Sequence, residues 1–380
     1  MVAYHQMGHQ SDNLVDATEL ASFGGAILSP VNYSRSQIET FIKQNRKREG
    51  FELIFDPQLY YPRTPKEKLR SWSYFPNEFE TTDYTAPSGW SSLIDTLAQT
   101  VTSLEPHAVC TPAIVPRRYT DEYFGLGNEI AEMLIRATKG FEVSVLQTVV
   151  VALGDLTDFS HVKSISSIIT ASRADRVYLV FGSSAANPRR ELTSTEELKG
   201  AMLLIDSLQT NGVDTLVGFC SSELILWKAA GATSCATGKF WNTRRFNEGR
   251  WAADADQGSG QVAYFFEESL LAFLRESDIL RTTFALSDAS LRNPYYEEIK
   301  NRIAEGQAWV GHGWRQYLYW FADIERRLSS GETDATTLLK SADNMWGRVE
   351  EEQVILEERG NNGGWIRPWL RSVLEYRTPW

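Results

Sequence analysis

The chain has 380 residues, of which 42% are hydrophobic and 23% charged, and 49 acidic residues against 38 Lys and Arg give a formal net charge of −11. This composition excludes a disordered or fibrous chain, and the length suits one large domain with an appendage. No apolar run reaches the roughly 20 residues of a membrane span, and Met1–Asn13 has no apolar signal-peptide core. We therefore expect a cytoplasmic protein without a membrane partner.

Short apolar runs alternate with helical patterns along most of the chain. Near-continuous apolar strands separated by helices are typical of a buried parallel sheet, and eight such units match a closed (β/α)8 barrel of the TIM type. No dinucleotide-binding or P-loop glycine motif accompanies them. The sequence therefore predicts an α/β barrel over residues 21–283, preceded by an N-terminal segment over residues 1–20. The predicted strands are Gly25–Ser29, Phe51–Phe55, His107–Thr111, Ser144–Leu153, Arg176–Phe181, Thr215–Phe219, Ala232–Thr237 and Gln261–Phe266.

Residues 284–380 show helical patterns alone and form a predicted Trp-rich, helical C-terminal region. The tryptophans of its polar, glycine-interrupted tail have two interpretations. They either dock the tail onto the barrel or form an exposed surface for a partner protein. The expected helices are Asn293–Ala304, Trp309–Leu328, Thr333–Glu358 and Trp365–Tyr376, and the tail tryptophans are Trp346, Trp365, Trp369 and Trp380.

Three carboxylates follow predicted strands, where the active sites of such barrels lie. Asp56 precedes Pro57, which disfavours helical geometry and holds the side chain at the rim, so Asp56 is a candidate nucleophile or general base. Its alternative role is to open a turn. Asp155 is the second candidate, with Asp158 competing for the role of helix cap. Glu223 is the third, although acidic residues are also common at helix starts.

Arginine outnumbers lysine 27 to 11, and three arginine pairs follow predicted strands. Arginine contacts phosphate and carboxylate groups through two parallel hydrogen bonds, which lysine cannot do. Barrel geometry predicts that all three pairs share one face with Asp56 and bind an anionic ligand there. The pairs are Arg117 and Arg118, Arg189 and Arg190, and Arg244 and Arg245.

Further side chains near the predicted strand ends complete the expected binding face. Lys239 follows Gly238, which allows a ligand to approach the backbone, and Gln58 follows Asp56 by two residues. Tyr60 and Trp241 offer rings on which a base or sugar can stack. We therefore place Gln58, Tyr60, Lys239 and Trp241 with the arginines in the substrate site.

Neither a metal site nor a cofactor is expected. The chain has five histidines, and no two of them have ligand spacing. The three cysteines, Cys110, Cys220 and Cys235, are widely spaced and are interpreted as reduced, buried thiols.

These patterns favour an enzyme, although catalysis itself is not proven by them. The leading hypothesis is a barrel enzyme acting on a phosphate-bearing nucleotide or nucleic acid, by hydrolysis or transfer at a glycosidic or related bond. Asp56 would be the nucleophile or base, and Asp155 or Glu223 its partner. One alternative is a non-catalytic binding or scaffold subunit whose helical tail meets a protein partner. The other is a glycoside hydrolase that uses Asp155 with Glu223.

Overall fold

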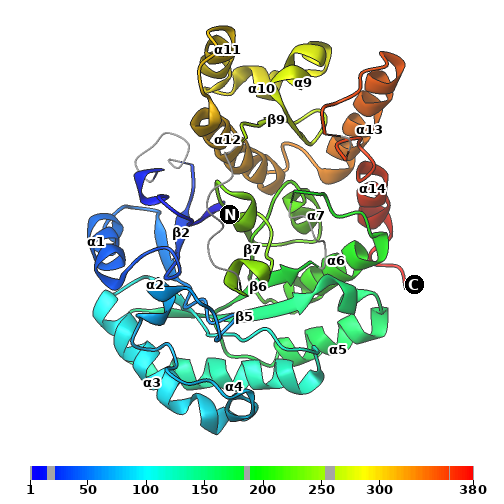
Figure 1. Ribbon diagram of the computed structural model, residues 1–380. Coiled ribbons are helices and arrows are strands. Elements are labelled where there is room, and N and C mark those ends of the chain that lie inside the picture. Colours follow the sequence, from blue (N-terminus) through cyan, green and yellow to red (C-terminus); the bar gives the residue numbers. More distant parts are fainter. Residues whose placement is uncertain (1, 15–21, 184–188, 253–261, 359, 380) are drawn as a thin grey trace.

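The computed structural model describes residues 2–14, 22–183, 189–252, 262–358 and 360–379. Eight parallel strands form a closed barrel in which the order of the strands follows the order of the chain. The prediction of a TIM-type barrel is therefore confirmed. The barrel strands are β1 (Tyr4–Gln6), β2 (Gly25–Leu28), β3 (Glu52–Phe55), β4 (Ala108–Cys110), β5 (Ser144–Ala152), β6 (Arg176–Gly182), β7 (Thr215–Gly218) and β8 (Ser234–Thr237) (Figure 1).

The first barrel strand lies in the N-terminal segment that the sequence analysis placed outside the barrel. Tyr4 pairs with Gly25 of β2 on one side and with Ala236 of β8 on the other, so β1 closes the ring. The proposed boundary at residue 20 is therefore wrong, because part of residues 1–20 belongs to the barrel. This strand is three residues long and contains His5 and Gln6, so it has no apolar run by which to recognise it.

The predicted eighth strand does not belong to the barrel. Phe265–Glu267 (β9) pairs in antiparallel fashion with Ala272–Leu274 (β10) in a separate two-stranded sheet. The start of the prediction, Gln261, lies outside the described residues. The strands predicted as third, fifth and seventh are therefore β4, β6 and β8, and the arginine pairs follow these three.

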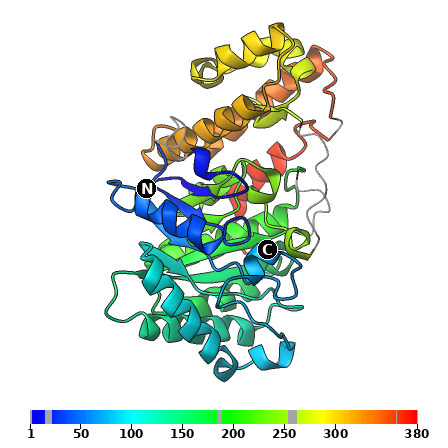
Figure 2. The same cartoon turned by 60° about the vertical axis from the view of Figure 1, so that its left-hand side comes forward.

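Helices between the strands cover the outside of the barrel (Figures 1 and 2). Their start signals include a capping box at Ser34, whose hydroxyl accepts from the backbone of Gln37 while the Gln37 side chain accepts from the Ser34 N–H. These helices are α1 (Arg35–Asn45), α2 (Glu67–Arg70), α3 (Pro87–Leu104), α4 (Asp121–Ala137), α5 (Phe159–Ile169), α6 (Thr195–Thr210) and α7 (Leu224–Ala229), and the short α8 (Gly249–Ala252) follows β8.

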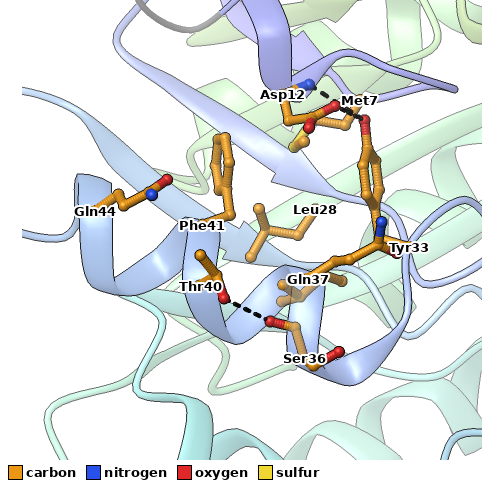
Figure 3. A pocket seen from close by; sticks show the side chains of 10 residues that line it. Met7, Asp12, Leu28, Tyr33, Ser36, Gln37, Thr40, Phe41 and Gln44 are labelled. Atoms are coloured by element: carbon orange, nitrogen blue, oxygen red, sulfur yellow. Dashed lines mark hydrogen bonds between the residues drawn. The ribbon is translucent and has the colours of Figure 1, made fainter.

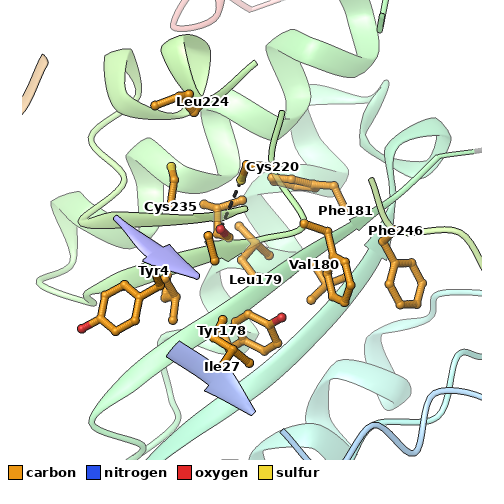
Figure 4. Close-up of a cluster of buried hydrophobic side chains, with 14 of the residues drawn as sticks. Tyr4, Ile27, Tyr178, Leu179, Val180, Phe181, Cys220, Leu224, Cys235 and Phe246 are labelled. Atoms are coloured by element: carbon orange, nitrogen blue, oxygen red, sulfur yellow. Dashed lines mark hydrogen bonds between the residues drawn. The ribbon is translucent and has the colours of Figure 1, made fainter. Parts of the chain in front are cut away.

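An ion pair across the barrel connects the amino ends of β3 and β6. Arg176 Nη1 donates to Glu52 Oε2 at 3.0 Å, and the Tyr4 hydroxyl donates to the same oxygen at 2.6 Å. The partial burial of these charges is therefore offset by direct pairing. Farther along β6, Tyr178 belongs to the cluster of buried side chains in Figure 4. A Cβ on Gly218 would lie 2.5 Å from the Tyr178 ring, so only glycine fits there.

The predicted helical C-terminal region is present, and it packs on one side of the barrel (Figures 1 and 2). Helix α12 contacts α7 and β9, whereas α14 packs against α6 and α13. The helices are α9 (Glu276–Arg281), α10 (Asp288–Arg292), α11 (Tyr296–Ala304), α12 (Val310–Ser329), α13 (Ala335–Glu351) and α14 (Ile366–Glu375).

The tail tryptophans dock this region instead of forming an exposed surface. Trp346, Trp365 and Trp369 are all buried. The indole N–H of Trp369 donates to Leu192 O at 2.7 Å, and that of Trp346 donates to Leu270 O at 2.9 Å. The suggestion that these residues meet a partner protein is therefore wrong for these three. Trp380 lies outside the described residues.

Replacing Trp369 with alanine is expected to lower the free energy of unfolding by about 3–5 kcal/mol, because it leaves a cavity under α14 and an unpaired Leu192 carbonyl. Urea unfolding followed by circular dichroism measures this loss. Leu374→Ala on the same helix is the matched control, since Leu374 is 63% exposed, and its effect is expected to stay within about 0.5 kcal/mol. Equal losses for the two variants would contradict the docking role.

Candidate functional site

Asp56 lies directly after β3, at the carboxyl end of the barrel. Its side chain is 1% exposed, Oδ1 accepts from the Gln58 N–H at 3.0 Å, and Oδ2 accepts from the Tyr60 hydroxyl at 2.9 Å. Gln58 has a φ of 54°, in the left-handed region that residues other than glycine rarely adopt. The carboxylate therefore holds the turn, as its alternative role predicted, and it also holds the Tyr60 side chain.

Burial raises the pKa of Asp56 to about 7, against the opposing effects of its hydrogen bonds from Gln58 and Tyr60 and of the Arg250 charge. The Gln58 side chain is itself engaged, because its Oε1 accepts from Ser29 Oγ and from the Val31 N–H, both at 3.1 Å. A carboxyl with a pKa near 7 both gives and takes protons at neutral pH, as a general acid or base must.

Aromatic side chains pack around Tyr60, whose hydroxyl donates to Asp56. The Tyr60 ring lies 5.0 Å from that of Phe246 and 5.2 Å from that of Trp251 on α8. Thr64 Oγ1 donates to Trp251 O at 2.6 Å and so ties α8 to the loop after β3. The loop after β3 and helix α8 are therefore packed together beside Asp56.

A hollow of about 700 Å³ is lined in part by the loop after β3, and we call it the arginine hollow. Tyr60 is one of its lining residues, so a single side chain contacts both the hollow and the Asp56 carboxyl. The walls carry three arginines, two carboxylates and several rings: Arg63, Arg117 and Arg118; Glu122 and Glu248; and Tyr61, Phe79, Tyr84, Trp90, Tyr123 and Phe124.

A second hollow of about 420 Å³ lies between the loop after β8 and helix α12, and we call it the lysine hollow. Among the described residues, it shares no lining residue with the arginine hollow. Its walls include Arg189, Lys239, Trp241 and Arg244, all of which the sequence analysis assigned to substrate binding.

The three arginine pairs thus do not converge on one site with Asp56, contrary to the expectation. Arg117 and Arg118 line one hollow, and Arg189 and Arg244 line the other. Arg190 is exposed and lines neither of these hollows.

Arg245 is buried in an ion-pair cluster. Its Nη2 lies 3.2 Å from Glu223 Oε2 and 3.4 Å from Glu191 Oε2. Burial raises the pKa of Glu191 to about 7, whereas the Arg245 charge opposes this change. Glu223 therefore forms a buried ion pair with Arg245. Two predicted site residues, one catalytic and one binding, stabilise each other in this cluster.

Asp155 is exposed in a 3-10 helix after β5, Leu153–Leu156. The neighbouring Asp158, and not Asp155, caps α5, because its side chain accepts from the His161 N–H at 2.8 Å. Gly238 also differs from its expected role. A Cβ there would lie 2.3 Å from Thr243 Oγ1 and 2.4 Å from Gln6 O, so the glycine serves close packing and not ligand approach.

The site contains residues that the sequence analysis missed. The Tyr178 hydroxyl donates to Gln6 Oε1 at 2.9 Å inside the barrel. Burial raises the pKa of Tyr178, and the charge of Asp56 raises it further. The charge of Arg250 on α8 lowers the pKa of Asp56 and so opposes the larger effect of burial. Gln6 could be recognised as a polar residue inside the barrel only after Tyr4–Gln6 was known to be a strand. Tyr178 could not be recognised as a site residue, because a single tyrosine in the apolar run of β6 is common in a buried strand.

A third hollow, of about 270 Å³, lies outside the barrel between β2 and α1 (Figure 3). Asp12 is the only carboxylate among those lining residues that the structure describes, and it accepts from the Tyr33 hydroxyl at 2.9 Å. These residues therefore offer no pair of carboxylates for acid–base chemistry.

Within the described part of the chain, no cluster of three or more His, Cys, Asp or Glu side chains is arranged to hold a metal ion. In the same residues, no helix combines the length and the apolar character that crossing a membrane requires.

No family model matches the chain, and no curated protein matches it. The putative copper homeostasis protein CutC from Streptococcus agalactiae is 16% identical over 64% of this chain and 99% of its own, with a TM-score of 0.38. A type I 3-dehydroquinate dehydratase from Clostridium difficile is 8% identical over 66% and 88%, with a TM-score of 0.36. A mandelate racemase/muconate lactonizing enzyme is 8% identical, with a TM-score of 0.35, and this chain covers only 52% of its length. Similarities this distant carry no functional argument.

The raised pKa of Asp56 has a consequence for stability. The folded protein keeps the Asp56 proton up to about pH 7, whereas the unfolded chain releases it near its ordinary value of roughly 4. Stability relative to Asp56→Asn is therefore expected to fall as pH rises from 4 to 7, by at most about 4 kcal/mol, and to stay constant above pH 7. Urea unfolding of both proteins across this range measures the difference. Parallel stability curves would show that Asp56 titrates normally.

Proposed function

We propose that the protein is a barrel enzyme that acts on a phosphate-bearing nucleotide or nucleic acid bound in the arginine hollow. The observation that carries this proposal is the position of Tyr60, which lines the hollow and donates its hydroxyl hydrogen to the buried carboxyl of Asp56. A group that exchanges protons near neutral pH is thereby connected to a ligand-sized space of about 700 Å³.

Three arginines supply the positive charge for the phosphate. Arg63, Arg117 and Arg118 are exposed side chains that line the hollow. In the described part of the chain, none of them lies within ion-pair distance of a carboxylate, so their charges are available to a ligand. Guanidinium groups bind phosphate oxygens through paired hydrogen bonds.

Aromatic rings in the same hollow suit a flat base. The Phe79 and Tyr84 rings stack at 5.0 Å, and the Trp90 ring meets Tyr84 edge-on at 5.1 Å. Arg63 lies over the Phe79 ring at 5.7 Å, so charge and ring surface adjoin each other. This combination is what nucleotides and single-stranded nucleic acids require.

The reaction we propose is hydrolysis or transfer at a glycosidic or related bond. When Asp56 is protonated, its carboxyl donates to the Tyr60 oxygen, and the Tyr60 hydrogen is then free for the leaving atom. As the bond breaks, the Tyr60 hydroxyl gives this hydrogen to the leaving atom and takes the proton of Asp56. The return of a proton from the attacking water or alcohol then restores both groups. Burial raises the pKa of Tyr60 far above its ordinary value, so the hydroxyl keeps its proton between turnovers.

The two alternatives have less support. A glycoside hydrolase that uses Asp155 with Glu223 needs both carboxylates at the substrate, but Glu223 is bonded to Arg245. The scaffold hypothesis was motivated by tail tryptophans of which three are buried.

Base or product release from nucleoside monophosphates and short oligonucleotides, followed by liquid chromatography, tests the catalytic assignment. Asp56→Asn and Tyr60→Phe are each expected to lower kcat by about 10²–10⁴-fold, with a smaller effect on KM, because each removes a proton-transfer group. Asp155→Asn is the matched control and is expected to keep wild-type activity. Wild-type rates in Asp56→Asn and Tyr60→Phe would refute the proton path.

Binding of a labelled oligonucleotide at several salt concentrations tests the arginines separately. Arg117→Ala/Arg118→Ala is expected to weaken binding about ten-fold or more and to flatten the dependence of log Kd on log salt by roughly one to two. Arg292→Ala, which removes an exposed charge from α10, is the control and is expected to change neither quantity. An unchanged affinity and salt slope in the double variant would exclude the arginine hollow as the anion site.

A further inference from the structure

Two buried cations in the loop after β8 have no carboxylate partner among the residues that the structure describes. Lys239 is 6% exposed and Arg244 is 4% exposed. Within the described ranges, neither forms an ion pair, whereas several other buried or half-buried cations do. The paired examples are Arg176 with Glu52, Lys228 with Glu325, Arg245 with Glu191 and Glu223, and Arg327 with Glu268.

Arg244 is held firmly in its position. Its Nε donates to Gly238 O at 2.9 Å and its Nη2 donates to Lys239 O at 3.0 Å. The guanidinium carbon lies 3.6 Å from the centre of the Tyr317 ring on α12. These contacts orient the charge but do not neutralise it.

Lys239 is held in a similar way. Its Nζ donates to Gln10 O at 2.9 Å and lies 4.9 Å and 5.2 Å from the ring centres of Phe240 and Trp314. Burial lowers the pKa of Lys239 to about 8, partly opposed by Asp12, which acts from beyond ion-pair distance. Burial also lowers the pKa of Arg244 to about 10, opposed by Tyr317 and Glu191. Unpaired charges of this kind are costly, and a bound anion removes that cost.

Both cations line the lysine hollow, and the remaining walls suit an anion with a ring. Its lining residues include a third cation, Arg189, but no Asp or Glu among those that the structure describes. The arginine hollow, in contrast, contains Glu122 and Glu248. The rings in the lysine hollow are those of Phe240, Trp241, Tyr264, Phe273 and Trp314.

We propose that the lysine hollow is a second ligand site, which binds an organic phosphate dianion through Lys239 and Arg244 and stacks the ligand's flat ring on the aromatic walls. Two fixed positive charges match the two negative charges of a phosphate monoester, and the rings add contact area. The ligand would contact both the loop after β8 and α12, so binding also strengthens the attachment of the C-terminal region to the barrel. This inference does not rest on the proposed catalytic function, because the two hollows have no lining residue in common in the described part of the chain.

Isothermal titration calorimetry tests this site, with AMP, ribose 5-phosphate, adenosine and succinate as probes. The Arg117→Ala/Arg118→Ala protein serves as the background, so that binding in the arginine hollow does not obscure the result. We expect AMP to bind most tightly, ribose 5-phosphate more weakly, and adenosine and succinate at least about ten-fold more weakly than AMP. Adding Lys239→Met is expected to weaken AMP binding by about ten-fold or more, whereas Lys239→Arg keeps it within a few-fold.

Two controls separate loss of binding from loss of folding. Arg292→Met removes an exposed cation outside the hollow and is expected to leave AMP binding unchanged. Lys239→Met is expected to unfold at the same or a higher temperature than its background protein without ligand, because it removes an unpaired buried charge. AMP is expected to raise the Tm of the background protein but not that of the Lys239→Met protein.

The proposal is overturned if AMP binds equally well with and without Lys239→Met. It is also overturned if neither phosphate binds at up to about 10 mM, or if succinate binds as tightly as AMP. A catalytic failure of Asp56→Asn leaves these binding results unaffected, so the two proposals fail separately.

Discussion

The burial of ionisable side chains inside the barrel is the constraint on which the site depends. At the amino end, Glu52 and Arg176 face each other across the barrel and neutralise one another directly. At the carboxyl end, Asp56 has hydrogen bonds and the more distant charge of Arg250 but no ion pair. The amino end is therefore held by a direct ion pair, whereas the carboxyl end holds a carboxyl whose pKa is raised by burial to about 7. The charged groups at the amino end thus stabilise the fold, whereas the carboxyl at the other end is the one we propose for proton transfer.

Aromatic packing around Tyr60 holds the loop after β3 against the segment that follows β8. The Tyr60 ring meets the Phe246 ring edge to face and the Trp251 ring at a tilt. The C-terminal helices matter here as well, because α12 provides Trp314 to a hollow wall and Tyr317 to the contacts of Arg244. The helical region thus completes a binding surface and is not only an appendage to the barrel.

The sequence predicted those parts of the fold that local pattern determines. The strands β2 to β8 are apolar runs ended by glycine, proline or polar residues, and these features are visible one segment at a time. By contrast, β1 is defined by its pairing with β2 and β8, because Tyr4–Gln6 has no local pattern of its own. The β9 strand has the composition of a barrel strand, but its partner is β10, and composition does not specify a partner.

The same distinction applies to the site. Asp56 was identifiable because Pro57 fixes the chain at a strand end, which is a local signal. The positions of the arginine side chains could not be predicted, because they depend on how each loop folds after its strand. Adjacent residues therefore have different roles: Arg244 lines a hollow, whereas Arg245 pairs with Glu223.

The most direct test of this account is a carbon-13 NMR titration of the Asp56 carboxyl in the intact protein, assigned by comparison with Asp56→Asn. The account predicts a midpoint at about pH 7, because burial outweighs the hydrogen bonds and the Arg250 charge. A midpoint near the ordinary aspartate value of roughly 4 would contradict it, because the barrel would then hold no proton-transfer group beside the arginine hollow.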